Sequence, residues 1–196
     1  MTAPARYPAD ALARFCAAAL VELGVARPDA ALVADCLVSA NLDGVDTHGV
    51  ARLPTYLRRI AQGAINAQAV VREVSSHGAV SVLDGDNALG PVAALAGMQR
   101  AAAAAATHGI GCASVRNSNH FAHAAYYCEW AAQRGLVGVC SSGGEPNVAP
   151  WGGRKAFFTN SPVAVAAPTS TDPVVVDFAT SVSSRGNIML AKLMGQ

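Results

Sequence analysis

The spacing of the apolar residues changes near residue 70, and no other feature of the sequence constrains the fold as strongly. Before this point, three successive segments repeat their apolar residues at helical intervals, and Gly24 and Gly63 mark where the first and third should end. After it, short apolar runs alternate with helical segments, which is the order of an α/β domain. The sequence therefore predicts a helical N-terminal domain over residues 1–70 and an α/β domain over residues 71–196.

Turn-forming residues set the boundaries of the elements expected after residue 70. These elements are a strand over 80–84 with a turn at 85–87, a helix over 91–107, a strand that begins near 109 and runs into a polar loop by 120, a helix over 121–133, strands over 136–141, 163–167 and 174–178, a loop over 142–153, and a helix over 183–193. Their order leaves the strand directions open.

The fingerprint of the classical dinucleotide fold is missing from this α/β region. Gly109 and Gly111 form a G-x-G, but they precede a strand and no third glycine follows at the required spacing. The region is therefore expected to be α/β without being a Rossmann fold.

Composition and charge exclude several classes of protein. The chain has 196 residues, is 52% hydrophobic and 14% charged, and carries a formal net charge of +1. That much apolar material excludes wholesale disorder, and the near-neutral balance gives no case for binding nucleic acid or an anionic membrane. The N-terminus lacks an apolar signal segment, and the alanine-rich helix is too polar to span a bilayer.

The five cysteines are odd in number, widely spaced and without a C-x-x-C pair. Free thiols in the cytoplasm are therefore expected rather than a disulfide framework. Cys112 and Cys140 fall in apolar strands, where we expect buried, unreactive thiols.

The sequence disfavours two kinds of site, a metal site and the nucleophile of an α/β hydrolase. His120 and His123 have helical spacing for a metal pair, but a third ligand is missing, so no metal is expected and His123 is interpreted as a helix-surface or packing residue. The G-x-S-x-G of α/β hydrolases is also absent from the sequence.

The first candidate cluster is Thr47-His48 with Arg52 and Tyr56. One interpretation is structural: Asp46 or Thr47 caps the third helix, and His48 is a loop residue. The other is chemical: His48 donates a proton, Thr47 orients it, and Arg52 binds a carboxylate through its planar fork.

The second candidate cluster is Asn117-Ser118-Asn119-His120. In one interpretation Ser118 or Asn119 caps the following helix. In the other, the four side chains form a polar cradle at a helix N-terminus, which suits a phosphate or a nicotinamide amide.

Four longer stretches resemble, in order and spacing, the type 2 malate/L-lactate dehydrogenases. This family also includes ureidoglycolate, sulfolactate and diketogulonate dehydrogenases and reductases of cyclic imino acids. The resemblance runs from about residue 8 and is carried by THGVARLPTYLRRIAQGAIN, GIGCASVRNSNHFAHAAYY, VAPWGG and VVVDFATSVSSRG. It implies a helical N-terminal domain followed by a non-Rossmann α/β domain that binds NAD or NADP, and hydride transfer between the nicotinamide and a small 2-hydroxy or 2-oxo acid.

The resemblance also implies roles for individual residues. His48 corresponds to the acid/base, assisted by Thr47, and Arg52 to the carboxylate binder, with Tyr56 and Thr159 at the substrate. A homodimer in the cytoplasm is expected. The cofactor-contacting residues implied are His120, Phe121, Ala122, His123, Ala124, Pro173, Val174, Val175, Val176, Asp177, Phe178, Ala179 and Thr180.

The sequence departs from the family pattern in several places. Thr47 stands where the family has serine, which keeps the hydroxyl, and the family's G-T-N-P reads Thr159-Asn160-Ser161-Pro162. Asn187 stands where some imine-reducing members carry an acid, which favours an oxo acid.

Family members continue well past the last residue of this chain, so the cofactor domain is expected to be incomplete. The dehydrogenase therefore has two alternatives. One is an inactive remnant that serves as a folding or dimerisation module, and the other is a cyclic imino acid reductase.

Overall fold

The computed structural model describes residues 6–183, 186–188, 191 and 195. The chain forms two compact units, Met1–Ala122 and His123–Gln196, and both contain helices and a sheet. The predicted α/β class is therefore confirmed. The domain boundary predicted near residue 70 lies inside the first unit, in the connection between the helix over 53–61 and the strand over 72–77. This boundary stays a prediction.

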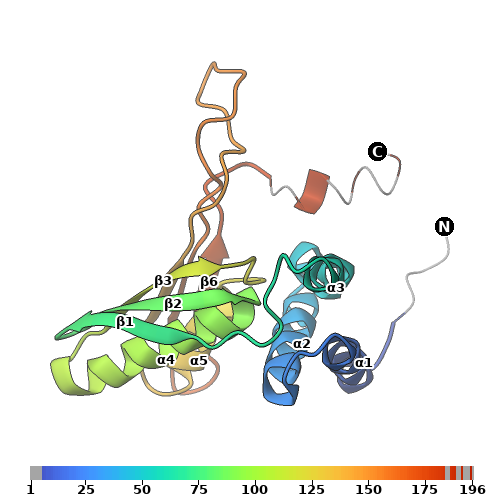
Figure 1. Cartoon of the computed structure of the whole chain (residues 1–196). Coiled ribbons are helices and arrows are strands. Elements are labelled where there is room, and N and C mark those ends of the chain that lie inside the picture. The colour runs from blue at the N-terminus through green and yellow to red at the C-terminus, as the bar shows by residue number, and fades with distance from the viewer. Residues whose placement is uncertain (1–5, 184–185, 189–190, 192–194, 196) are drawn as a thin grey trace. The chain divides into compact units, whose positions relative to one another are not determined.

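Three helices open the first unit: α1 (Ala9–Glu22), α2 (Arg27–Leu42) and α3 (Leu53–Ala61) (Figure 1). Apolar residues at helical spacing are buried between them, as the sequence predicts. Phe15 shares the spacing of the buried face of α1 but is 64% exposed, so the packed stripe of this helix is narrower than the pattern indicates.

A three-stranded sheet follows in the first unit. Its strands β1 (Arg72–His77), β2 (Val80–Ala88) and β3 (Cys112–Ser118) lie in that order, with β1 antiparallel and β3 parallel to β2. The helix α4 (Gly90–His108) makes the crossover from β2 to β3 and lies along one face of the sheet (Figure 1). The observed α4 agrees with the predicted helix.

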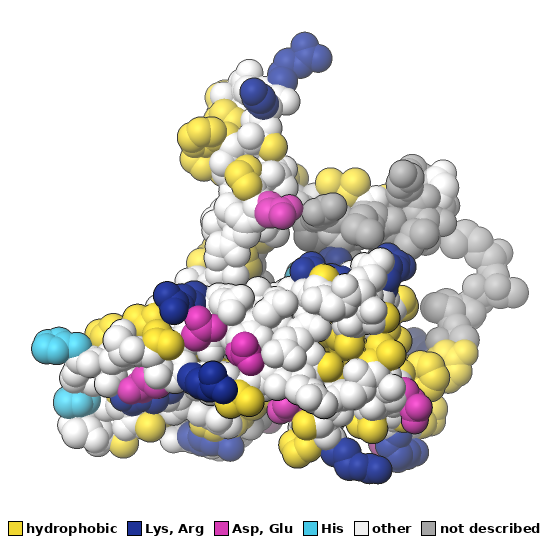
Figure 2. All heavy atoms as spheres, in the orientation of Figure 1, with side chains coloured by type: hydrophobic (Ala, Val, Ile, Leu, Met, Phe, Trp, Pro, Cys, Tyr) yellow, Lys and Arg dark blue, Asp and Glu magenta, His cyan; other side chains and the backbone are white. Residues whose placement is uncertain are grey.

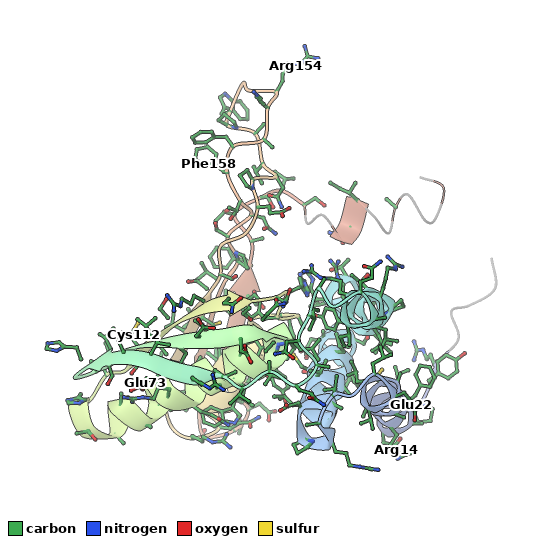
Figure 3. All side chains as sticks on the ribbon, viewed as in Figure 1. Arg14, Glu22, Glu73, Cys112, Arg154 and Phe158 are labelled. Atoms are coloured by element: carbon green, nitrogen blue, oxygen red, sulfur yellow. The ribbon has the colours of Figure 1, made fainter. Side chains whose placement is uncertain are left out.

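Three details of this sheet differ from the sequence prediction. β1 was not predicted, because its segment REVSSH has a single large apolar residue and all six positions are exposed. The turn predicted at 85–87 is part of β2, in which Asp86 and Asn87 adopt positive φ angles of 51° and 58° without ending the strand. Cys112 is exposed at the start of β3, so its predicted burial is wrong (Figure 3).

The second unit contains α5 (Ala125–Ala132) and an antiparallel sheet of β4 (Gly138–Ser141), β5 (Val163–Ala167) and β6 (Val174–Phe178), in the order β4-β5-β6. The strands begin and end close to the predicted positions. Ala122 has a φ of 61°, a conformation that interrupts a helix, and this explains why α5 begins at Ala125 rather than at residue 121.

The two faces of the β4-β5-β6 sheet differ in burial. α5 packs against β4 and β5, where Ala164 and Ala166 are fully buried. On the opposite face, Val139, Val165 and Val176 lie side by side in register and are exposed. We call this second surface, which also includes Val174 and Phe178, the open face.

A long segment over residues 142–162 connects β4 to β5 and extends beyond the strands (Figure 1). It is irregular, as predicted for 142–153, apart from an isolated antiparallel bridge between Val148 and Phe158. Figure 2 shows hydrophobic side chains along this segment and basic side chains at its tip, where Figure 3 labels Arg154. Trp151 and Phe157 are exposed.

The predicted C-terminal helix falls largely outside the described residues. Of the range 183–193, residues 186–188 and 191 are described as helical, and the other positions from 184 onward are not described. No helix within the described part of the chain is long and apolar enough to cross a membrane. All five cysteines lie in the described part and are free thiols, as predicted.

Candidate active site

Two short 3-10 turns, η1 (Asp46–His48) and η2 (Val50–Arg52), carry the first candidate cluster between α2 and α3. Asn41, near the end of α2, forms hydrogen bonds with both turns. Its amide nitrogen donates to Asp46 Oδ1 at 2.5 Å, and its Oδ1 accepts the backbone N–H of Val50 at 2.8 Å. A Cβ on the intervening Gly49 would collide with the Asn41 side chain, so a larger residue there would displace Asn41 from these bonds.

This arrangement tests the capping role in the structural interpretation of the cluster. Arg52 is the N-cap of α3, and no side chain caps that helix, so the expected capping role of Asp46 or Thr47 is wrong. Sequence reasoning missed Asn41 because an asparagine nine residues before its backbone partner carries no recognisable spacing signal.

Within the turns, Thr47 bonds both His48, through its side chain, and Arg52, through its backbone carbonyl. Thr47 Oγ1 lies 2.9 Å from His48 Nδ1, and Arg52 Nε donates to the Thr47 carbonyl at 2.6 Å. All three residues are half-buried. These bonds fix the His48 ring through one of its nitrogens and fix the plane of the Arg52 guanidinium.

The second candidate cluster meets the first through His120. The rings of His48 and His120 stack with centroids 5.5 Å apart and planes inclined by 25°. Tyr56, on α3, places its hydroxyl 2.7 Å from His120 Nδ1 and 3.2 Å from the His120 carbonyl oxygen. Residues 64 positions apart in the chain thus form one cluster within the first unit.

Burial and charge keep two members of this cluster neutral. Desolvation, followed by the positive charge of Arg52 and the neighbouring His48 and Arg59, lowers the pKa of His120, although the residue still has an exposed side. Tyr56 is only 2% exposed, and its burial raises the pKa of its phenol well above the usual range. A neutral phenol therefore faces a neutral imidazole.

Asn119 anchors the segment that carries His120. Its amide nitrogen lies 2.9 Å from both Asn87 Oδ1 and the Ala88 carbonyl, and its Oδ1 accepts a bond from Arg59 Nη2 at 2.9 Å. The helix α5 starts at Ala125 and has no side-chain cap, so the expected cap at Ser118 or Asn119 is wrong.

Gly90, at the start of α4, lets the same segment approach closely. A Cβ at this position would collide with the backbone carbonyls of Asn119 and His120. On either side of the segment, Asn117 and Ala122 adopt positive φ angles of 52° and 61°, which are uncommon for residues other than glycine. The position of His120 therefore depends on contacts that the motif Asn-Ser-Asn-His does not reveal.

The remaining candidate residues lie outside this cluster. Phe121 and Ala122 end the first unit, half-buried and buried. His123 and Ala124 open the second unit and are buried; His123 is 4% exposed and precedes α5, so it is a packing residue, not a helix-surface residue.

The candidates of the second unit bond mainly to backbone. Asp177, on β6, accepts the N–H of Ala125 at 2.9 Å. Thr159 Oγ1 accepts the N–H of Ser161 at 3.0 Å, and Thr180 bonds the carbonyl of Asn160 through both its N–H and its hydroxyl. Pro173 precedes β6 and Ala179 follows it. The other candidates lie on β6 itself: Val174, Val175, Val176 and Phe178.

The polar groups of the second unit fit the carboxamide of a nicotinamide cofactor better than its pyrophosphate. A helix N-terminus is the usual place for a pyrophosphate, but the N-terminus of α5 holds the Asp177 carboxylate and does not fit a second anion. β6 pairs with β5 alone among the described strands, so its other edge presents backbone N–H and C=O groups. Such groups fit the carboxamide of a nicotinamide.

The described residues contain no group of three or more His, Cys, Asp or Glu side chains that could hold a metal ion. The pair His120 and His123 is divided between the two units and has no helical spacing, since neither residue lies on α5.

Comparison with known proteins places the chain in a family. The family model described as malate/L-lactate dehydrogenase matches residues 7–196. The chain is 39% identical to a malate dehydrogenase of Pyrococcus horikoshii over 191 residues, which are 97% of this chain and 53% of the relative.

Solved structures agree with that match. The structure of malate dehydrogenase from Entamoeba histolytica aligns with a TM-score of 0.94 at 34% identity, over 98% of this chain and 54% of that one. A δ1-piperideine-2-carboxylate reductase from Pseudomonas syringae aligns with a TM-score of 0.89 at 28% identity, over 98% of this chain and 58% of that one. The chain thus spans about half the length of the relatives it matches. With the family model covering nearly all of its residues, the chain belongs to the malate/L-lactate dehydrogenase family.

Proposed function

We propose that the chain carries the proton-transfer and carboxylate-binding part of an NAD(P)-dependent oxidoreductase acting on a small 2-hydroxy or 2-oxo acid. The observation that carries this proposal is a cluster in which His48 and Arg52 lie on short, internally bonded turns and the His120 ring stacks on His48. A proton donor beside a cationic fork is what the reduction of a 2-oxo acid requires, because the substrate carries a carbonyl next to a carboxylate.

The two halves of the substrate are assigned to different residues. Arg52 binds the carboxylate, with its guanidinium plane set by the bond from Nε to the Thr47 carbonyl. His48 gives a proton to the carbonyl oxygen as it becomes an alcohol, and Thr47 orients the imidazole through Nδ1. In the direction of oxidation, the same ring accepts the proton from the alcohol.

The cofactor is NAD or NADP, and when bound it supplies or accepts the hydride. The residues proposed to hold it are 120–124 and 173–180, with Thr159 near the substrate or cofactor. The unpaired edge of β6 supports this assignment for the carboxamide, and it leaves the pyrophosphate to residues other than the N-terminus of α5.

Cyclic imino acids are the alternative substrates. They carry a C=N bond next to a carboxylate, so the same proton donor and the same arginine would serve them. The structural similarity to a δ1-piperideine-2-carboxylate reductase supports this class of substrate. An inactive module that folds or dimerises is the alternative from another class.

We propose association into a homodimer, in the cytoplasm. The open face of the β4-β5-β6 sheet supports association, because its exposed valines form one continuous apolar surface. Five free cysteines support a reducing compartment.

One experiment separates these candidates. The chain is titrated with NADH and with NADPH by nicotinamide fluorescence, then assayed by nicotinamide absorbance against a panel of 2-oxo acids and one cyclic imine carboxylate. Turnover of an oxo acid supports the dehydrogenase, and turnover of the imine alone supports the reductase. Failure to bind either cofactor favours the inactive module.

A further inference from the structure

We infer that Tyr56 is a positioning residue whose hydroxyl holds the His120 ring with Nδ1 as a hydrogen-bond acceptor and the proton on Nε2. For its effect on turnover this inference rests on the proposed function, whereas the position of the proton on the ring does not. The resemblance to the dehydrogenases assigns Tyr56 to the substrate; the contacts in the structure point to a role exerted through His120.

The direction of the bond follows from a third group. The backbone N–H of Ala122 lies 3.3 Å from His120 Nδ1. An amide N–H can only donate, so Nδ1 must offer its lone pair. The Tyr56 hydroxyl has one proton and two acceptors in reach, Nδ1 at 2.7 Å and the His120 carbonyl oxygen at 3.2 Å, and with Nδ1 accepting it donates in the shorter bond. A neutral imidazole with an accepting Nδ1 carries its proton on Nε2.

The environment holds both partners in the states that this bond requires. Tyr56 is 2% exposed, so its hydroxyl has little access to water, and burial keeps the phenol protonated by raising its pKa. The groups facing His120 are Arg52, His48, Arg59 and Tyr56, of which the arginines carry positive charge. They disfavour an imidazolium at this position.

The position of Tyr56 on α3 explains why this residue can fix the ring. α3 also carries Arg59, which holds Asn119, the residue directly before His120. The helix therefore contacts the 119–120 segment twice, once through a guanidinium and once through a phenol. A ring held in this way presents Nε2–H as a donor and offers no second acceptor nitrogen to a ligand.

The test reads the proton position directly. The chain is labelled with ¹⁵N, and long-range ¹H–¹⁵N correlations of the histidine rings are recorded without cofactor or substrate, with His120→Gln identifying the His120 signals. We expect the Nε2–H tautomer in the wild-type chain. In Tyr56→Phe the ratio of the Nε2–H to the Nδ1–H tautomer should fall about two- to tenfold, the change that one hydrogen bond gives, and the pKa of His120 should rise.

Tyr7→Phe is the matched control, because Tyr7 is exposed and should leave the His120 signals unchanged. A proton on Nδ1 in the wild-type chain overturns the inference even if Tyr56→Phe fails to fold. An unchanged tautomer ratio in a folded Tyr56→Phe variant also overturns it. Neither outcome bears on the dehydrogenase assignment, since no turnover is measured.

If the chain turns over an oxo acid, kinetics provide a second reading. A positioning role predicts that Tyr56→Phe lowers kcat and leaves KM within about twofold, because the substrate does not touch the hydroxyl. A rise in KM with unchanged kcat would instead return Tyr56 to substrate binding and contradict the inference.

Discussion

The candidate residues of the first unit bond to one another, whereas those of the second unit bond to the backbone of their own fold. Thr47 bonds His48, the rings of His48 and His120 stack, and Tyr56 bonds His120, all through side chains, while Arg52 bonds the Thr47 carbonyl. Asp177 holds the start of α5, and Thr159 and Thr180 hold turns. The difference supports the proposal that the proton-transfer and carboxylate-binding residues lie within residues 41–122, whereas the second unit supplies a sheet and its edge.

The largest expected effect tests the chemical half of this comparison. His48→Ala should lower turnover about 10²–10⁴-fold, the usual contribution of a general acid, because the proton to the substrate is lost. NAD(P)H affinity should stay within about twofold. The measurement is steady-state turnover together with a fluorescence titration.

His77→Ala is the control for this variant, since His77 is an exposed residue at the end of β1. A His48→Ala variant with nearly full turnover would show that the bonded cluster is structural, and the contrast between the two units would then carry no functional meaning.

Gly90→Ala should damage the framework of the cluster rather than its chemistry. The added methyl group meets the carbonyls of Asn119 and His120, and overpacking of this kind costs about 1–3 kcal/mol in the free energy of unfolding. Denaturant unfolding measures the loss. Gly143→Ala, at a position with open space around it, should leave the stability unchanged; equal effects from both substitutions would contradict the close packing at Gly90.

Arg52→Lys should raise KM for an oxo acid about tenfold although the charge is retained. A lysine cannot donate to the Thr47 carbonyl and also present two parallel donors to a carboxylate. Arg58→Lys, six residues farther along on α3 and exposed, should leave KM unchanged. An unaltered KM in Arg52→Lys would exclude this residue from carboxylate binding.

Asp177→Ala gives the smallest expected effect and tests the second unit. Removal of the carboxylate at the N-terminus of α5 should cost about 1 kcal/mol of stability, as the loss of a helix cap does. Asp172→Ala, in the loop before β6, is the matched control. A loss of cofactor affinity without a loss of stability would show that Asp177 serves the cofactor and not the helix.

The sequence predicted the helices and most strands because their apolar periodicity is strong, as in α4 and β5. It missed β1 because an exposed edge strand has no buried face to leave a pattern. It could nominate His48 and Arg52, since their residue types and spacing indicate chemistry. It could not find Asn41, Gly49 or Gly90, because a close approach between segments far apart in sequence is set by tertiary packing.

The open face of the β4-β5-β6 sheet makes the stability of this chain depend on the concentration of whatever binds that face. Anything that covers Val139, Val165 and Val176 binds the folded state and not the unfolded one. If a second copy is the cover, the melting temperature must rise with protein concentration, because association then contributes to the free energy of folding. The same surface that leaves the isolated chain prone to association would then set the concentration below which its fold begins to weaken.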